Sequence, residues 1–285
     1  MPDLWHSFDM SYTLSSTEVG MAQARLGDRV EGWTAPVRPG PKKIAGHYVE
    51  LEVLSAQKHA ADLFQSFQGH DNIWDYLPSG PFNSSSQFYR WVNEMTQSDD
   101  PLFYAIRNLS SRKWEGMASF LRIQPNAGSI EVGHISFSPA LQRTTAATEA
   151  IFLMMCWVFE TGYRRFEWKC NALNAPSRRA AQRLGFSYEG IFRQATVIKG
   201  RNRDTAWFAM IDKEWPALKE AYDVWLSPRN FDQSGLQKEK LGNLTGLVRV
   251  TSDPTLKTAR FGTTRDFNRA KSWGSSSRSK AVSIS

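Results

Sequence analysis

The sequence predicts an α+β domain, a mixed, mostly antiparallel twisted sheet of six to seven strands with a central buried helix and flanking helices. Strand-like segments follow one another between residues 102 and 137 and are joined by short turns, as in an antiparallel meander. A helix from Ala146 is apolar nearly all round, so it must be buried. Helical segments precede the meander and separate the strands that follow it.

The first half of the domain is expected to hold two helices before the meander. Apolar residues alternate in the first strand, recur at helical spacing in the first helix, and follow N-cap serines in the second helix. The predicted strands are 47–55, 102–108, 114–125 and 129–137, and the predicted helices are 56–68 and 84–95.

The second half is expected to alternate helices and strands. The short helix 174–185 has an Asn cap, an early proline and a closing glycine. A turn at 199–204 is expected between the last two strands. The predicted elements are a helix from 146 to about 162, strands 164–172, 186–192 and 204–211, and a final amphipathic helix 212–226.

Composition divides the chain into three parts. These are a weakly structured N-terminal extension, 1–45, a domain, 46–226, and a basic, serine-rich tail, 227–285, which is expected to be disordered. The tail holds 11 Lys and Arg against 4 Asp and Glu, so its net charge of +7 equals that of the whole chain. Nucleic-acid binding would therefore rest on the tail alone.

Several classes of protein are disfavoured. The longest apolar run, Ile151–Phe159, is far shorter than the roughly 20 residues of a membrane span. The N-terminus lacks the pattern of a secretory signal, so we expect a cytoplasmic protein, and the basic tail leaves a nuclear location open. Cys156 and Cys170 lie in apolar segments, which favours buried, inert thiols over disulfides or a zinc site.

Residues 137–150, FSPALQRTTAATEA, contain a polar loop before the central helix. Free N–H groups at a helix N-terminus form an anion site. The loop has no glycine, but glycine is needed only where φ is positive. We therefore expect negative φ throughout, with the amides of Arg143 to Ala147 converging on one point. The plainer alternative is a helix capped by Thr144 or Thr145.

A second junction, Asn174-Ala175-Pro176-Ser177, also follows the end of a strand. The plain interpretation is again a helix cap, with Ser177 in the first turn. Both junctions are expected at the same edge of the sheet, where one long ligand could lie across them.

Three ordered motifs resemble the GNAT superfamily of N-acetyltransferases, in its ribosomal-protein-type (RimJ/RimL-like) branch, over about residues 46–213. The first is Glu131-Val132-Gly133 with Phe137-Ser138-Pro139. The second, Gln142 to Ala147, fills the pattern Q/R-x-x-G-x-G/A, with Thr145 in place of the first glycine. The third is Asn174-x-x-Ser177 with Leu184-Gly185-Phe186.

The resemblance implies a GNAT fold whose splayed central strands admit acetyl-CoA as co-substrate, with the amine of a small molecule or a protein N-terminus entering from the opposite side. A backbone N–H near Ile135–Phe137 would polarise the thioester carbonyl. The implied acetyl-CoA contacts are Ile135, Phe137, Gln142, Arg143, Thr144, Thr145, Ala146, Ala147, Asn174 and Ser177.

Catalytic groups are also implied by the resemblance. Ala181 stands where many relatives carry a tyrosine, and Ser177 would instead hydrogen-bond the leaving sulfur. Glu131 and Glu167 are the candidate bases, His134 is a third, and a water chain is an alternative. Plain roles stay open as well, as surface carboxylates for the two glutamates and as a core histidine for His134.

The acceptor site is expected near Trp74 and Tyr76 and near the turn at 199–204, where Asp204 or Arg203 would hold the acceptor. Simple packing and a solvated hairpin are the alternatives. The expected partners are acetyl-CoA and an amine, without a membrane or a metal, with nucleic acid only as a weak partner of the tail, and as a monomer or homodimer. A rival hypothesis is a non-catalytic binding module whose tail docks on nucleic acid or an acidic partner.

Overall fold

The computed structural model describes residues 27–256. The chain divides into two units at Thr34 and Ala35, and every helix and strand of the described residues belongs to the second. Residues 1–26 of the expected extension and 257–285 of the expected tail lie outside the described residues. Within 27–256, no helix combines the length and apolarity needed to cross a membrane.

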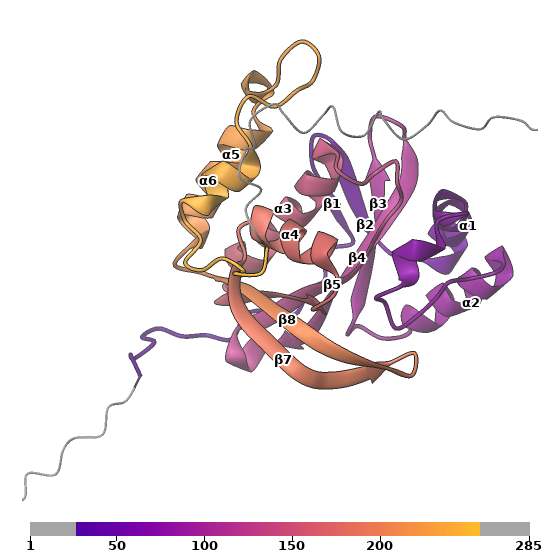
Figure 1. Ribbon diagram of the computed structural model, residues 1–285, viewed down its shortest axis with the longest axis horizontal. Helices are drawn as coiled ribbons and strands as arrows, with labels where there is room; N and C mark the ends of the chain where they lie inside the picture. Colours follow the sequence, from indigo (N-terminus) through magenta and orange to yellow (C-terminus); the bar gives the residue numbers. More distant parts are fainter. Residues whose placement is uncertain (1–26, 257–285) are drawn as a thin grey trace, which may run out of the picture. The chain divides into compact units, whose positions relative to one another are not determined.

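The core of the second unit is a mixed eight-stranded sheet in the order β1-β2-β3-β4-β5-β6-β8-β7 (Figure 1). Neighbouring strands are antiparallel except for the parallel pair of β5 and β6. The strands are β1 Lys43–Ala45, β2 Val49–Val53, β3 Leu102–Asn108, β4 Lys113–Gln124, β5 Ser129–Phe137, β6 Arg165–Asn171, β7 Ser187–Ile198 and β8 Arg201–Ile211. The predicted α+β class is confirmed, but the count of six to seven strands is wrong, because residues 43–45 pair with β2 as an additional strand.

Helices pack on both faces of the sheet (Figure 1). The helices α1 and α2 and the 3₁₀ turn η1 share one core with Phe103 and Met117, whereas α3 to α6 share the other core with Tyr104 and Phe120. Their bounds are α1 Ala56–Phe67, η1 Asp71–Trp74, α2 Ser85–Met95, η2 Pro125–Ala127, α3 Thr145–Glu160, α4 Ala175–Arg183, α5 Trp215–Leu226, η3 Pro228–Asn230 and α6 Leu241–Gly246.

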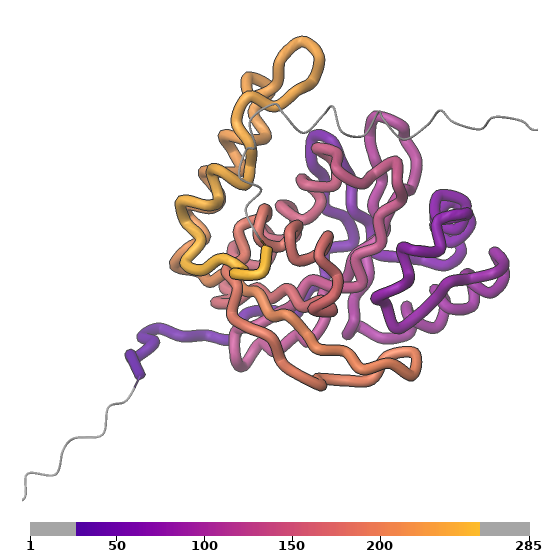
Figure 2. Tube along the Cα trace, viewed as in Figure 1, coloured from indigo at the N-terminus to yellow at the C-terminus, as the bar shows by residue number. Residues whose placement is uncertain are grey.

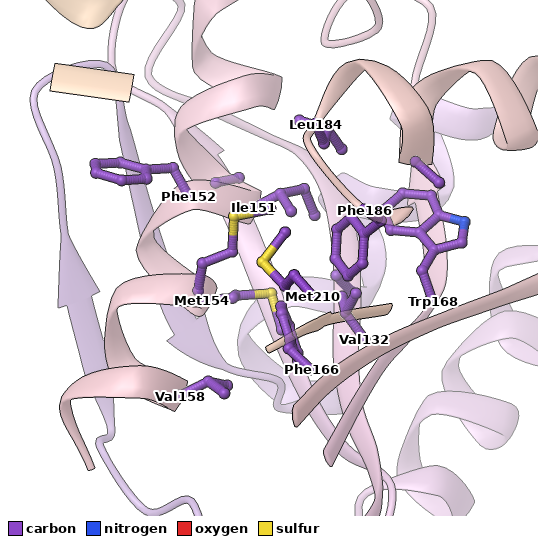
Figure 3. Packing of buried hydrophobic residues seen from close by; sticks show 14 of the residues in the cluster. Val132, Ile151, Phe152, Met154, Val158, Phe166, Trp168, Leu184, Phe186 and Met210 are labelled. Carbon is purple, nitrogen blue, oxygen red and sulfur yellow. The ribbon is translucent and has the colours of Figure 1, made fainter. Parts of the chain in front are cut away.

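The predicted central buried helix is α3, which has 16 residues. Ile151, Met154 and Val158 project from it toward Phe166 and Met210 of the sheet (Figure 3). Each such side chain contributes about 1.5–3 kcal/mol when fully buried. This packing fixes the N-terminus of α3 relative to β5 and β6.

The parallel pair of β5 and β6 separates halfway along. The two strands pair from Ser129 with Arg165 to Val132 with Trp168. Beyond these residues both strands continue but no longer pair with each other. On its other edge β5 has a bulge, because Gly133 faces Ser119 while Ser136 faces Met117. His134 lies in this bulge with φ 48°. The splay expected between these strands is present and places free backbone at the middle of the sheet.

The hairpin of β7 and β8 ends in a two-residue turn. Lys199 and Gly200 have φ values of 50° and 71°, and Ile198 pairs with Arg201, as in a type I′ turn. The turn expected at 199–204 is therefore too long, and residues 201–204 belong to β8. The Lys199 ammonium donates to the Trp74 carbonyl at 2.8 Å, which fastens the hairpin tip to η1.

The segment after α5 folds back beside it and packs on the domain (Figure 2). Leu241 is buried, and the carboxylate of Asp253 accepts a 2.8 Å hydrogen bond from Nε of Arg178 on α4. The disorder expected from residue 227 thus does not extend to residues 227–256. The segment before β1 also contacts the domain, since Tyr104 donates its hydroxyl to the Pro41 carbonyl at 2.9 Å.

Candidate active site

A cavity of about 660 Å³ lies where β5 and β6 separate. Side chains alternate between the two faces of a strand, so the cavity is lined from both sides of the sheet. Trp168 and Cys170 come from the face covered by α3 and α4, whereas Glu131, Lys169 and Arg203 come from the face covered by α1 and α2. The cavity therefore connects the two faces through the gap.

The outer wall is formed by η1 with the residues that follow it and by the β7–β8 hairpin. Tyr76 and Leu77 line the cavity from the first segment, and Phe192 and Thr196 line it from the second. The Tyr76 hydroxyl donates to the Leu173 carbonyl at 3.4 Å. The volume lies within the roughly 300–1,000 Å³ that is typical of small-molecule sites.

The loop before α3 forms a partly open cradle of backbone amides. Thr144, not Thr145, caps the helix, and its hydroxyl oxygen accepts from the Ala147 amide at 3.0 Å. The Thr144 amide donates to the Leu141 carbonyl at 3.3 Å. Within residues 27–256, the amides of Arg143, Thr145 and Ala146 make no hydrogen bond. These amides and the dipole of a long helix fit a bound phosphate.

Two expectations for this loop are wrong. Arg143 has φ 62°, so φ is not negative throughout, and the amides of Thr144 and Ala147 are already paired, so the amides from Arg143 to Ala147 do not all point to one site. The side-chain amide of Gln142 donates to the Phe137 carbonyl at 2.8 Å and holds the loop against the end of β5. A non-glycine residue in the left-handed region of φ costs about 1–2 kcal/mol, which the surrounding contacts must offset.

The junction before α4 carries Asn174 and Ser177, which both line the cavity. The Asn174 side chain accepts from the Ser177 amide at 3.1 Å and caps the helix. The Ser177 hydroxyl accepts from the Trp168 indole N–H at 3.0 Å. Burial raises the pKa of the Cys170 thiol, and the Ser177 hydroxyl acts against that rise. Because Ser177 accepts from Trp168, its own proton can be donated either to the Cys170 sulfur or toward the cavity, which both residues line.

Glu131 is a buried carboxylate in the wall of the cavity. Its Oε2 lies 2.7 Å from Nη1 of Arg122 and 3.0 Å from Nζ of Lys169. Within residues 27–256, its Oε1 makes no hydrogen bond. Burial raises the pKa of Glu131, although Arg122 and Lys169 oppose the rise. This carboxylate can therefore accept a proton more readily than an exposed one.

Glu167 lies opposite Glu131 across the strand pair but does not line the cavity. Lys169 and Arg165 hold its two oxygens at 2.7 and 2.6 Å. Burial raises its pKa, but the hydrogen bonds from Lys169 and Arg165 outweigh that effect, so the pKa of Glu167 is lowered.

His134 lines the cavity from the bulge of β5. Its Nδ1 lies 2.9 Å from the Ser119 hydroxyl, and its ring lies 5.1 Å from that of Phe103. Burial lowers the pKa of His134 to about 4, and the charges of Arg122 and Arg203 add to the decrease. The imidazole is therefore neutral near pH 7.

The predicted acceptor residues have different locations. Tyr76 lines the cavity, whereas Trp74 is 3% exposed and lies in the core shared with α2. Asp204 does not line the cavity, and its carboxylate accepts from the Gln194 amide at 2.8 Å. Of the predicted acetyl-CoA contacts on β5, Ile135 lines the cavity and Phe137 does not.

Sequence reasoning missed several residues of the wall, most of them cationic. Arg122, Lys169 and Trp207 were not predicted, and Arg203 was weighed only as part of a turn. Lys169 also lies with its Nζ 3.8 Å from the centre of the Trp207 ring. Alternation along β8 could have found two of them, because Arg203, Thr205 and Trp207 share one face. No cluster of three or more potential metal ligands occurs within 27–256.

Comparison with known proteins places this site in a family. Residues 49–187 match the model of an acetyltransferase (GNAT) domain. The chain is similar to a GCN5-related N-acetyltransferase from Brucella melitensis, whose crystal structure has a sequence identity of 47% and a TM-score of 0.74 to it. The match covers 76% of this chain and 100% of the Brucella chain. A probable GNAT-family acetyltransferase from Chromobacterium violaceum is 42% identical over 68% of this chain and 98% of its own, with a TM-score of 0.65. The SPbeta prophage-derived uncharacterized N-acetyltransferase YokL of Bacillus subtilis is 24% identical over 46% of this chain and 73% of its own.

Proposed function

Because this chain belongs to the family of GCN5-related N-acetyltransferases, we propose that it transfers the acetyl group of acetyl-CoA directly to a primary amine. The observation that carries the proposal is the cavity at the β5–β6 gap, which joins the side of the amide cradle to a charged chamber on the opposite face. Two substrates that enter from opposite faces would meet inside the sheet.

Acetyl-CoA fits the residues on the α3 and α4 side of the gap. The open amides of Arg143, Thr145 and Ala146 would bind its pyrophosphate, while Asn174 and Ser177 would contact the arm that leads to the thioester. When bound, acetyl-CoA supplies an activated acyl group. Beyond Val132, β5 is no longer paired with β6, so backbone N–H groups on that edge of β5 would be available to hold the carbonyl oxygen of that group.

Glu131 is the proposed general base. Its raised pKa suits proton acceptance, and its Oε1 is free to receive the proton of the amine directly or through a water. Glu167 remains a second candidate with weaker support, because both of its oxygens are bound to cations and it lies outside the cavity wall.

Ser177 is the proposed donor to the leaving sulfur. During transfer an amide C–N bond forms and a thioester C–S bond breaks, so one proton leaves the amine and one reaches the thiolate. The hydroxyl of Ser177 accepts from Trp168 and can donate its own proton toward the sulfur. This serine, with Ala181 in place of the tyrosine, also supports our proposal that the chain belongs to the RimJ/RimL-like branch.

Calorimetry with acetyl-CoA tests the proposal first. Absence of binding at about millimolar ligand would refute it. Thr145→Asp places a carboxylate at the first residue of α3 and is expected to weaken binding at least tenfold by charge repulsion. Ser85→Asp is the matched control, since Ser85 is the exposed first residue of α2. Equal affinity of the two variants would contradict the placement of the cradle.

A panel of amines, including N-terminal peptides, then tests transfer by the mass shift of one acetyl group. Ser177→Ala is expected to slow transfer without loss of acetyl-CoA binding. An unchanged rate in this variant would remove Ser177 from the mechanism.

A further inference from the structure

Arg203 is a cation of the cavity wall without an anionic partner. It lies on β8 on the same face as Thr205 and Trp207, and all three line the cavity. The only hydrogen bond of its side chain within residues 27–256 goes from Nε to the Thr205 hydroxyl at 3.3 Å. No carboxylate of the described chain lies within 4.0 Å of its guanidinium.

The other cations of the wall differ from Arg203 in this respect. Arg122 pairs with Glu131, and Lys169 pairs with both Glu131 and Glu167. The charged lining thus comprises three cations and one carboxylate, a net charge of +2, while residues 1–226 as a whole are neutral. Arg203 is half-buried, and a charge that is partly removed from water is stabilised by an anionic partner. Within residues 27–256 no carboxylate lies close enough to serve as that partner.

The position of Arg203 assigns that partner to the acceptor rather than to acetyl-CoA. The phosphate cradle at α3 lies toward the opposite face of the sheet, and its residues 142–147 do not line the cavity. Arg203 lines the cavity together with His134 and Cys170, which flank the gap, so the guanidinium belongs to the wall where β5 and β6 separate.

We infer that the acceptor is an amine that carries an oxyacid group, a carboxylate or a phosphate, and that Arg203 binds this group. The inference rests on the proposed acetyltransferase function. A guanidinium matches the paired oxygens of both groups and can donate two parallel hydrogen bonds to them. The size of the cavity fits a small amino acid or amino phosphate together with the arm of acetyl-CoA.

The charge balance also favours the reactive form of such an acceptor. With one carboxylate bound, the lining still carries a net charge of +1, whereas a bound phosphate, at about −1.5 to −2, brings it close to zero. A nearby positive charge disfavours an ammonium group and lowers the pKa of the amine. The amine must be neutral to attack, so the same lining that holds the oxyacid promotes the nucleophile.

The test compares matched acceptors. Amino carboxylates of different chain length are paired with their amides, and aminoalkyl phosphonates are paired with their diethyl esters, so the two arms separate carboxylate from phosphate. Transfer from acetyl-CoA is followed by mass. The neutral partner has the less basic amine, so a preference for the acid cannot come from amine protonation.

The full-length protein should prefer at least one acid over its neutral partner by about 10- to 100-fold in kcat/KM. Arg203→Gln should remove this preference through a higher KM, and Arg203→Lys should restore part of it. KM for acetyl-CoA and the urea midpoint should stay unchanged in both. Arg201→Gln is the control, because Arg201 is exposed on the same strand and lies outside the cavity wall.

Equal rates for acids and their neutral partners would overturn the inference and leave the proposed function intact. So would a preference that survives in Arg203→Gln, or a protein that binds acetyl-CoA but acetylates none of the acids. A protein that fails to bind acetyl-CoA would instead overturn the proposed function itself.

Discussion

The substitution Asp253→Ala should strongly lower the free energy of unfolding of the domain, although Asp253 lies beyond α5, the last long helix. The Asp253 side chain is 0% exposed, and that of its partner Arg178 is 9% exposed. Arg178 also donates from Nη1 to the Ala172 carbonyl at 2.9 Å, so the pair holds the loop that leads into α4. Removal of one partner from a buried ion pair costs about 3–5 kcal/mol, because the remaining charge is buried without compensation.

Urea unfolding followed by the fluorescence of the 11 tryptophans measures this loss. Asp232→Ala is the control, since Asp232 is exposed in the same segment and accepts only from the local turn at Ser234 and Leu236; it should cost less than about 1 kcal/mol. The double variant Arg178→Met, Asp253→Leu should recover most of the loss, because neither charge remains. Equal midpoints for Asp253→Ala and Asp232→Ala would refute the reasoning.

Three further predictions concern other ionisable side chains. Glu149→Ala should cost at least about 2 kcal/mol in urea unfolding, because its carboxylate accepts from three consecutive backbone amides at the start of β2, and Glu160→Ala at the exposed end of α3 should cost little. The pKa of His134 is lowered to about 4 in the folded protein, so the unfolded chain binds a proton at this residue at a higher pH than the folded protein does. The free energy of unfolding should therefore fall as the pH drops from about 6.5 to 4. His134→Gln should make this dependence on pH weaker than in wild type, whereas an unchanged dependence would contradict the assignment. Glu131→Gln should reduce kcat by roughly 100-fold while calorimetry shows unchanged acetyl-CoA affinity, and a fully active variant would exclude Glu131 as the base.

The sequence predicted the parts of the fold that depend on hydrophobic periodicity. The helix α3 is apolar on all sides, and the strands of the meander alternate, so both were found close to their observed bounds. The strand pair that separates could be placed only through the resemblance to a family, because a gap between strands leaves no periodic pattern of its own.

Other parts depend on contacts that periodicity does not record. Residues 241–256 have low hydrophobicity, which suggested disorder. In the structure they are held by a buried ion pair and a few apolar side chains. Lys199-Gly200 is not one of the common hairpin pairs, and the length of β8 was underestimated for that reason. Arg203 was consequently assigned to a turn, where it was one of two candidates for holding the acceptor, and the alternation along β8 that places it on the same face as Thr205 and Trp207 was not used.

The wall that the β7–β8 hairpin contributes to the cavity is largely separate from the cores that stabilise the domain. Residues 191–197 of β7 are exposed, although several of them line the cavity, and the hairpin tip is fastened to η1 through Lys199. Exposed substitutions usually change stability by less than about 0.5 kcal/mol. If this wall binds the acceptor as proposed, directed evolution of the outer half of the hairpin can alter acceptor choice at little cost in folding and leave the proposed acetyl-CoA site on the opposite face intact.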